Sequence, residues 1–378
     1  MKDCYEMSEL SATESLHYQR HLALPQFGIS NQKKLKSSSI LVVGAGGLGC
    51  PALQYLAAAG VGKIGIIDGD KVEASNLQRQ VLFNYNDIGK YKAETARNKI
   101  SLLNPHIEIE HFNERLSPEN IEVRLSAYSI ILDGSDNFET KYLLNDASIL
   151  FNKVLIYGSI FEFSAQISVF NLNNGPTYRC LFPEPPSGNA LPPCAEAGVL
   201  GVLPGIAGSI QASEAIKVMT GLGNPLSGKL LLFDALTLKT QIVTFNLRPD
   251  SRNIQTLPTT SPSCSALRDQ GKSISEIDTF EMKEMNESGK TDIIIDVREQ
   301  WERDELKISP SVHIPLGCFE HPEQIEFPVS IKQDSHIVIY CKAGVRSRMA
   351  CHALQEMGYR NLYNLSGGIM EWSNYPKA

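Results

Sequence analysis

A glycine-rich loop near the amino terminus restricts the fold of this chain more than any other feature. The run "ILVVGAGGLGCPALQYLAAAG" is a strand-like stretch, then Gly44, Gly46 and Gly49 in the spacing G-x-G-x-x-G, then a helix-like stretch. Glycine here allows a tight turn and lets a phosphate approach the backbone at a helix N-terminus. The pattern predicts an α/β fold with a Rossmann-like nucleotide-binding domain.

The rest of the chain predicts two domains. Strand-like and helix-like stretches alternate through about residue 248, which indicates a mainly parallel sheet covered by helices. Residues 249–273 are rich in Ser, Thr and Pro and are interpreted as a linker. A second, shorter α/β alternation follows. We therefore expect a nucleotide-binding domain over 1–248, a linker over 249–273 and a smaller α/β domain over 274–378.

Charge and cysteine usage exclude several classes of protein. The net charge of −7 argues against a nucleic-acid partner or an anionic membrane. The uncharged stretch 37–62 holds six glycines and changes from a strand pattern to a helix pattern, so it does not read as a membrane span. The eight cysteines lack the dense spacing of a secreted disulfide scaffold. With no signal-peptide pattern at the N-terminus, we expect a cytoplasmic protein with reduced thiols.

The residues after the loop bear on whether the domain binds a nicotinamide dinucleotide or a nucleoside triphosphate. Asp68 ends the next strand, where a carboxylate can bind ribose hydroxyls, and on this basis alone a nicotinamide-dependent oxidoreductase is favoured. Asn76, Arg79 and Lys92 then follow, and such groups suit a triphosphate better than an uncharged nicotinamide. The alternative is that Arg79 and Lys92 are solvated surface charges.

A further strand ends in two carboxylates. The run "IILDGSDNFETK" places Asp133 and Asp136 at the carboxyl end of a strand. Carboxylates at that edge of a sheet can hold magnesium against phosphates. The sequence therefore predicts a magnesium site there.

Together these motifs resemble a known family. "GAGGLG", "DGDKVEASNLQRQ", "GKYKAETA", "LNPH" and "DGSDN" have the order and spacing of the MoeB/ThiF family of ubiquitin-activating-like adenylyltransferases, over about residues 15–248. The molybdopterin-synthase adenylyltransferases are the most similar members. The resemblance implies that the C-terminal glycine carboxylate of a ubiquitin-like sulfur carrier attacks the α-phosphate of ATP, which gives an acyl-adenylate and pyrophosphate.

The resemblance also assigns site residues. It implies ATP binding by Gly44, Gly46, Gly47, Gly49, Asp68, Ser75, Asn76, Leu77, Gln78, Arg79 and Lys92. Asp136 would hold Mg²⁺, with Asn137 beside it. Arg20, in "YQRHL", would reach the phosphates bound by a partner subunit, which implies a homodimer. Arg20, Arg79 and Lys92 would neutralise the repulsion between carboxylate and triphosphate, and no general base is needed because a carboxylate is already a nucleophile.

Three cysteines of this domain have different expectations. Cys194, in "GNALPPCAEAG", matches a mobile-loop cysteine of the family, and a reactive thiol or a buried small side chain are both open. Cys50 is interpreted as packing. Family members often carry zinc on two C-x-x-C pairs, but here Thr177 precedes Cys180 and "LRPDSRN" has no cysteine. One thiolate cannot hold tetrahedral zinc, so no zinc is predicted and packing would replace it.

The second domain resembles a rhodanese. The runs "IIIDVRE", "IVIYCKAGVRS" and "NLYNLSGGIMEW" carry that similarity. Cys341 follows a strand, and Lys342, Arg346, backbone N–H groups and a helix N-terminus can all stabilise its thiolate or persulfide. The predicted persulfide loop is Cys341, Lys342, Ala343, Gly344, Val345, Arg346 and Ser347.

The two resemblances combine into one hypothesis. A separate sulfur donor such as a cysteine desulfurase loads Cys341 with a persulfide, which attacks the acyl-adenylate. The resulting acyl-disulfide is released as thiocarboxylate by a second thiol, for which Cys194 is the candidate. The carrier ends in Gly-Gly. The small subunit of molybdopterin synthase is favoured, and the carriers of thiamine biosynthesis and tRNA thiolation are alternatives.

Two alternatives come from other classes of protein. One is a nicotinamide-dependent oxidoreductase fused to a sulfur-handling module, against which Arg79, Lys92 and Asp136 speak. The other is a non-catalytic carrier-binding scaffold, which the presence of Asp136 and Cys341 disfavours.

Overall fold

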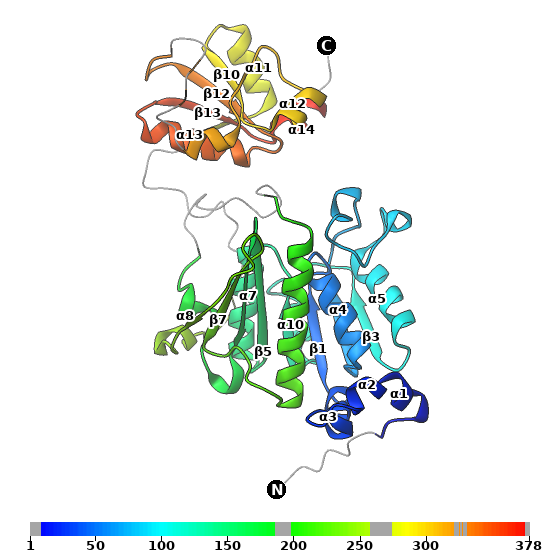
Figure 1. The fold of residues 1–378 in the computed structure, drawn as a ribbon. Helices are drawn as coiled ribbons and strands as arrows, with labels where there is room; N and C mark the ends of the chain where they lie inside the picture. Colours follow the sequence, from blue (N-terminus) through cyan, green and yellow to red (C-terminus); the bar gives the residue numbers. More distant parts are fainter. Residues whose placement is uncertain are drawn as a thin grey trace. The chain divides into compact units, whose positions relative to one another are not determined.

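The described residues form two compact units. The computed structural model describes residues 9–185, 198–257, 274–320, 325, 327 and 331–374 (Figure 1). Residues up to 257 belong to a first unit and residues from 274 to a second. In these ranges no helix combines the length and the apolar character that crossing a bilayer requires.

The first unit is built on one eight-stranded sheet. The strand order is β3-β2-β1-β4-β5-β6-β7-β8. Strands β1 to β5 pair in parallel, and β6 to β8 add an antiparallel extension. The strands are β1 (Ser39–Val43), β2 (Lys63–Ile67), β3 (Glu108–Phe112), β4 (Ile130–Asp133), β5 (Val154–Phe161), β6 (Ser164–Phe170), β7 (Lys229–Asp234) and β8 (Thr240–Thr244). The predicted Rossmann-like, mainly parallel sheet is confirmed.

Helices cover both faces of this sheet (Figure 1). The helices are α1 (Ala12–His17), α2 (Gln19–Leu22), α3 (Gly28–Lys36), α4 (Gly49–Ala59), α5 (Lys92–Leu103), α6 (Ile121–Leu125), α7 (Phe138–Leu150), α8 (Tyr178–Leu181) and α10 (Val202–Thr220). Short 3-10 turns are η1 (Ala74–Asn76), η2 (Tyr85–Asp87), η3 (Leu172–Asn174) and η4 (Pro249–Arg252).

The alternation of side chains along β1 explains why helices pack on both faces of the sheet. Successive strand residues point to opposite faces. Ile40 and Val42 pack with α3, α4, α5 and α10, whereas Leu41 and Val43 pack with α6 and α7. All four side chains are buried, so β1 is the centre of the core.

The strand order places a crevice at the carboxyl edge of the sheet. The chain winds to one side through β1, β2 and β3, and to the other through β4 and β5. Loops after strands on either side of such a reversal diverge and leave room for a ligand. The loops after β1 and β4 meet here, because a Cβ on Gly44 would lie 2.8 Å from the carbonyl oxygen of Gly134.

The second unit is a smaller, all-parallel sheet. Its order is β11-β10-β12-β13-β9, and every pairing is parallel. The strands are β9 (Ser275–Ile277), β10 (Ile293–Asp296), β11 (Val312–His313), β12 (His336–Tyr340) and β13 (Asn361–Leu365). The helices are α11 (Thr279–Glu287), α12 (Gln300–Glu305), α13 (Val345–Glu356) and α14 (Gly368–Asn374), with the 3-10 turn η5 (Leu316–Glu320). Helix α13 packs on one face and α11 and α14 on the other.

Candidate functional site

The glycine loop needs glycine at its two ends. Gly44 has a φ of +91°, which other residues rarely adopt. A Cβ on Gly49 would lie 1.9 Å from the carbonyl oxygen of Gly44. The chain therefore turns tightly enough to start α4 directly above the end of β1.

The middle of the loop presents unused donors. Among the described residues, the backbone N–H groups of Gly46, Gly47 and Leu48 have no recorded acceptor. Leu48 is the N-cap of α4 and offers no side-chain cap. Free N–H groups at the positive end of a helix suit an anion such as a phosphate.

Asp68 fastens this loop to the neighbouring strand. Its Oδ2 accepts a hydrogen bond of 2.8 Å from Ala45 N, and its Oδ1 accepts one of 2.8 Å from Asp70 N. Burial raises the pKa of Asp68, although the charge of Lys92 works in the opposite direction. Each oxygen keeps a lone pair, so ribose binding stays a prediction beside this structural role.

The segment after β2 brings unsatisfied polar atoms to the loop. Within the described residues, Asn76 Oδ1 and Gln80 Oε1 are buried and have no hydrogen-bond partner. Gln80 lies beside the loop, since a Cβ on Gly46 would be 3.8 Å from its Nε2. Buried acceptors without a donor are costly, and a ligand that supplies donors would remove the cost.

The other predicted residues of this segment surround those atoms. Arg79 Nη1 donates to Ser75 O at 3.2 Å, and Ser75 and Gln78 are exposed while Leu77 is partly buried. A Cβ on Gly47 would lie 3.0 Å from Pro204, near the start of α10, and 3.7 Å from Arg79 Cδ. The loop, this segment and α10 therefore border one region.

Lys92 is not a solvated surface charge. It is 7% exposed and begins α5, with its Nζ 3.5 Å from Asp70 Oδ2. Burial tends to raise the pKa of Asp70, but the hydrogen bond from Arg115 and the charge of Lys92 outweigh it and lower that pKa. A cation at a helix N-terminus opposes the helix dipole, so the position is one where an added anion would be favourable.

The two carboxylates at the predicted magnesium site, of which Asp136 is the predicted ligand, differ in availability. Asp133 is 1% exposed, and its carboxylate binds Lys141 Nζ at 2.9 Å and the backbone N–H of Ser135 at 2.9 Å. Asp136 is exposed and has no recorded partner in the described part of the chain. Asn137 caps α7 by accepting from Thr140 N at 2.8 Å. Of the pair, only Asp136 is free to take a cation.

Two predicted residues stand apart from this region. Arg20 is exposed on α2, which packs beside α3 at the amino edge of the sheet, whereas the glycine loop lies at the carboxyl edge (Figure 1). Arg20 is therefore remote from the glycine loop of its own chain, and its role toward a partner subunit stays a prediction. Cys194 lies outside the described residues.

A polar cluster surrounds Cys180. Its Sγ accepts from Thr177 N at 3.3 Å and from Arg248 N at 3.4 Å, and lies 3.1 Å from Ser251 Oγ. Burial acts to raise the pKa of Cys180, but these hydrogen bonds outweigh it and lower the pKa. The cluster joins α8 to η4, so the first residues of the expected linker pack on the first unit. Cys50, by contrast, is fully buried, and burial raises its pKa to about 12.

The Cys341 loop connects β12 to α13 and encloses the sulfur. Cys341 Sγ accepts a hydrogen bond from Gly344 N at 3.1 Å and lies 3.4 Å from Ser347 Oγ. Gly344 has a φ of +96°, and the loop is braced from α14 because Ile369 N donates to Cys341 O at 2.9 Å. Lys342 and Ala343 are exposed at its surface. The predicted loop therefore surrounds a sulfur with donors aimed at it.

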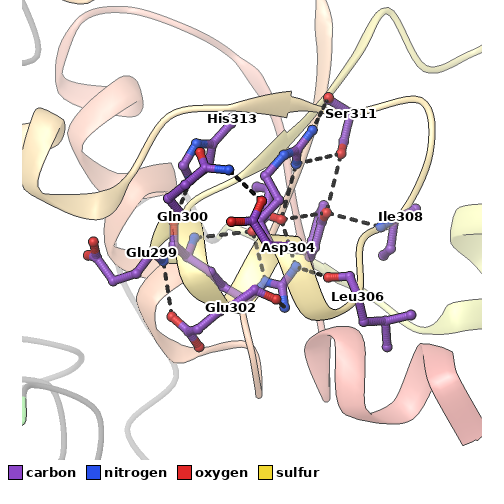
Figure 2. Close-up of polar contacts among 12 residues, drawn as sticks. Glu299, Gln300, Glu302, Asp304, Leu306, Ile308, Ser311 and His313 are labelled. Atoms are coloured by element: carbon purple, nitrogen blue, oxygen red, sulfur yellow. Dashed lines mark hydrogen bonds and ion pairs between the residues drawn. The ribbon is translucent and has the colours of Figure 1, made fainter.

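Sequence reasoning missed the carboxylates that hold this loop. Arg346 makes a two-bond ion pair with Glu302 of α12, and Arg348 bonds Glu276 of β9. Figure 2 shows Glu302 among the polar contacts that stabilise α12. The spacing R-E-x-x-E after "DV" is the only signal that could have pointed to Glu302.

Two family models match the chain. The description "ThiF family" matches residues 18–255, and "Rhodanese-like domain" matches residues 279–375. Together they cover both units.

Curated relatives that match nearly the whole chain or its first unit carry names consistent with these two families. The chain is 41% identical to "Probable adenylyltransferase/sulfurtransferase MoeZ" of Mycobacterium tuberculosis, over 97% of this chain and 94% of that protein. It is 49% identical to "Sulfur carrier protein adenylyltransferase" of Thermus thermophilus, over 61% of this chain and 88% of that protein. A crystal structure of E. coli MccB with ATP has a TM-score of 0.54 at 22% identity, over 65% of this chain and 73% of that chain. That last likeness shows the fold alone.

Proposed function

This chain belongs to the ThiF family and carries a C-terminal rhodanese-like domain, and we propose that it adenylates a sulfur carrier protein and then transfers sulfur to it. One observation supports the proposal most. Within the part of the chain that the structure describes, the first unit has loop amides without an acceptor near an Asp136 without a partner, and the second has a cysteine sulfur enclosed by donors. Full-length relatives named for both activities support the same pairing.

The nucleotide region fits ATP by its own chemistry. The N–H groups of Gly46, Gly47 and Leu48, which have no acceptor in the described ranges, would bind phosphate oxygens. The side-chain oxygens of Asn76 and Gln80, which have no donor there, would accept hydrogen bonds from the nucleotide. Among the described residues no group of three metal-ligating side chains occurs. Asp136 fits Mg²⁺ only as one ligand, with phosphate oxygens and water as the others.

The adenylation step needs charge compensation more than proton transfer. The carrier carboxylate attacks the α-phosphorus of ATP, a P–O bond forms, and the bond to pyrophosphate breaks. Arg79 and Lys92 of one subunit and Arg20 of its partner would reduce the repulsion between the anions and stabilise the leaving pyrophosphate. Bound magnesium would supply further neutralisation at Asp136. This assignment makes a homodimer the working unit.

The sulfur step uses the activated carboxyl group. The terminal sulfur of a Cys341 persulfide attacks the acyl carbon, AMP leaves, and an acyl-disulfide forms. A second thiolate then attacks the Cys341 sulfur and releases the carrier as thiocarboxylate. That thiol becomes disulfide-bonded to Cys341 and must be reduced by an external thiol. Cys194 is the proposed second thiol, and the linker 249–273 would let Cys341 reach the adenylate.

The carrier and the sulfur donor are the least specified partners. We propose a carrier that ends in Gly-Gly, with the molybdopterin-synthase small subunit as the first choice and the thiamine and tRNA-thiolation carriers as alternatives. A cysteine desulfurase would supply the persulfide, and the reaction would run in the cytoplasm without nucleic acid or membrane.

One experiment separates the two steps. The full chain is incubated with ATP, magnesium, a persulfide donor and each carrier, and intact mass reports acyl-adenylate and thiocarboxylate. We expect Cys341→Ala to accumulate adenylate and form no thiocarboxylate, and Asp136→Asn to form neither. If neither product appears with any of the three carriers, the proposed function is wrong.

A further inference from the structure

The first turn of α13 carries charge that opposes its own dipole. Arg346 and Arg348 lie in or next to this turn, which has no acidic residue. Cations are unfavourable at a helix N-terminus, by about 0.3–1 kcal/mol each at exposed positions. Each arginine finds its carboxylate on another element, Glu302 on α12 and Glu276 on β9. The two pairs are not equivalent.

The Glu302 pair is the more enclosed and the more directional. Arg346 Nη1 and Nη2 lie 2.7 and 2.8 Å from the two carboxylate oxygens of Glu302. The side chains are 14% and 10% exposed, against 32% and 36% for Arg348 and Glu276. A two-bond pair fixes the orientation of a guanidinium, and low exposure reduces screening by solvent.

The backbone that carries Glu302 is itself held in place. Arg298 donates to Glu302 O at 3.1 Å and to both carboxylate oxygens of Asp296 at 2.9 and 2.7 Å. Tyr340 OH donates to Asp296 Oδ2 at 2.7 Å. Tyr340 immediately precedes Cys341. The contacts therefore form a chain from Tyr340 through Asp296, Arg298 and Glu302 to Arg346, and they connect the two ends of the loop.

We propose that Glu302 is a positioning residue of the sulfur site: its carboxylate holds the Arg346 guanidinium in one orientation and moderates the positive charge that the Cys341 sulfur meets. The inference rests on the proposed role of Cys341 and adds to it a residue from outside the loop. Without the Glu302 carboxylate, Arg346 would lose a two-bond partner: its charge would favour the thiolate more strongly, and its guanidinium would be less firmly oriented during transfer.

A Glu302 substitution leaves the other charged or titratable side chains of the surrounding elements in the sequence. They are Lys342 in the loop, Arg348 and Cys351 on α13, Cys318 on η5, Glu276 on β9, Glu371 on α14 and Arg298, which precedes α12. Glu302 also accepts a hydrogen bond of 3.0 Å from Glu299 N, so a variant at Arg346 is needed to assign the effect to the pair.

The test compares Glu302→Gln with Asp304→Asn in the full chain. Asp304 is exposed on the same helix and bonds only Gln300 among the described residues, so its variant makes the same charge change away from Arg346. The rate of iodoacetamide alkylation of Cys341 is followed by peptide mass spectrometry against pH. We expect the midpoint to fall by about 0.5–1 pH unit in Glu302→Gln only, a shift typical of losing one partly buried charge. Sulfur transfer from the persulfide should slow by about tenfold or more.

A double-variant cycle asks whether Glu302 acts through Arg346. In an Arg346→Gln background, Glu302→Gln should leave the alkylation midpoint unchanged. A shift of equal size in both backgrounds, or no shift in a folded Glu302→Gln protein, overturns the inference. If Glu302→Gln fails to fold, Glu302→Asp replaces it: slower transfer with an unchanged midpoint supports positioning, and unchanged transfer overturns it.

The test of Glu302 and the test of the proposed function can fail independently of each other. If Cys341→Ala still yields thiocarboxylate, Cys341 is not the sulfur-bearing residue and the proposed sulfur step fails. The alkylation comparison at Cys341 still reports whether Glu302 controls its environment.

Discussion

Lys141 and Asp133 form a buried ion pair beneath the carboxyl edge of the large sheet. Lys141 Nζ lies 2.9 Å from Asp133 Oδ2, and the side chains are 5% and 1% exposed. The same ammonium group donates to Ser135 O at 3.1 Å and to Gly158 O at 2.8 Å. One side chain of α7 thus joins the end of β4, the loop that follows it and the middle of β5, next to Asp136.

Replacing Lys141 by Met should destabilise the first unit. Asp133 would remain buried without its counter-charge, which typically costs about 3–5 kcal/mol. Calorimetry of the full chain should show a lower transition temperature for the first unit and an unchanged one for the second. The double variant Lys141→Met with Asp133→Leu should recover part of the loss, and an unchanged first transition in the single variant would contradict the ion-pair argument.

Asp136→Asn should abolish adenylation without loss of stability. The carboxylate is exposed and has no recorded partner among the described residues, so nothing in the fold depends on it. Removing one charged group that stabilises a transition state costs about 10²–10³-fold in rate. Carrier-dependent exchange of labelled pyrophosphate into ATP measures the effect. Glu139→Gln, an exposed acid in the first turn of α7, three residues after Asp136, is the matched control and should keep full exchange.

Arg20 should act on the site of a second subunit. Arg20→Ala and Asp136→Asn should each be inactive alone. After mixing and subunit exchange, half of the dimers are mixed and each has one intact site, which restores about a quarter of wild-type exchange in a two-fold symmetric dimer. Activity that stays at background after verified subunit exchange would place Arg20 outside the partner's site.

The purified protein should contain no stoichiometric zinc. Cys180 is the sole cysteine of its cluster in the described residues, and the neighbouring groups at Thr177 and Ser251 are hydroxyls, which are poor zinc ligands. Elemental analysis should find well under one zinc per chain, and a chelator should leave the unfolding temperature unchanged. Because hydrogen bonds lower the pKa of Cys180, Ser251→Ala should raise the pH at which this thiol is alkylated.

The second unit should lose stability in acid. Burial acts to raise the pKa of Asp296 and of Glu302, but their arginine and other hydrogen-bond partners outweigh it and hold both values below 3.8 and 4.5, the ordinary ones. Their stabilisation is therefore complete above the unfolded-state pKa and is lost as pH falls through the lower folded-state pKa.

Tryptophan fluorescence isolates this effect. Both tryptophans of the chain, Trp301 and Trp372, lie in α12 and α14 of the second unit. The urea midpoint seen by fluorescence should be constant from about pH 7 to pH 5 and fall below about pH 4. Asp296→Asn should lower the midpoint at pH 7 by the equivalent of about 3–5 kcal/mol and weaken its acid dependence. A midpoint independent of pH down to about pH 3 would contradict the assignment.

Local patterns predicted most of what positions the two sites. The glycine spacing at Gly44 to Gly49 dictates a loop that only glycine can form, and the apolar runs around it alternate as strand residues do. The Cys341 loop is also contiguous in sequence, so the strand before it and the helix after it, which starts at Val345, could be predicted from local patterns.

The ion-pair partners of the site residues could not be predicted, because local patterns do not show which distant residues meet. Asp133 lies at a strand end where a carboxylate can hold a metal, and only the fold shows that its carboxylate accepts a hydrogen bond from Lys141. The sequence predicts that Arg346 stabilises the Cys341 sulfur, but it does not reveal the partner Glu302, which lies 44 residues away along the chain. Which charge meets which depends on tertiary packing, and no local spacing encodes that.

The bracing of the Cys341 loop by α14 sets an order in which the two activities can mature during synthesis. Ile369 N and Met370 N hold the carbonyl oxygens of Cys341 and Lys342, and β9, the first strand of the second unit, pairs with β13, its last. The first unit can fold while these residues are still inside the ribosome, but the sulfur loop cannot close until they emerge. In a nascent chain the glycine loop would thus form before the loop that encloses Cys341.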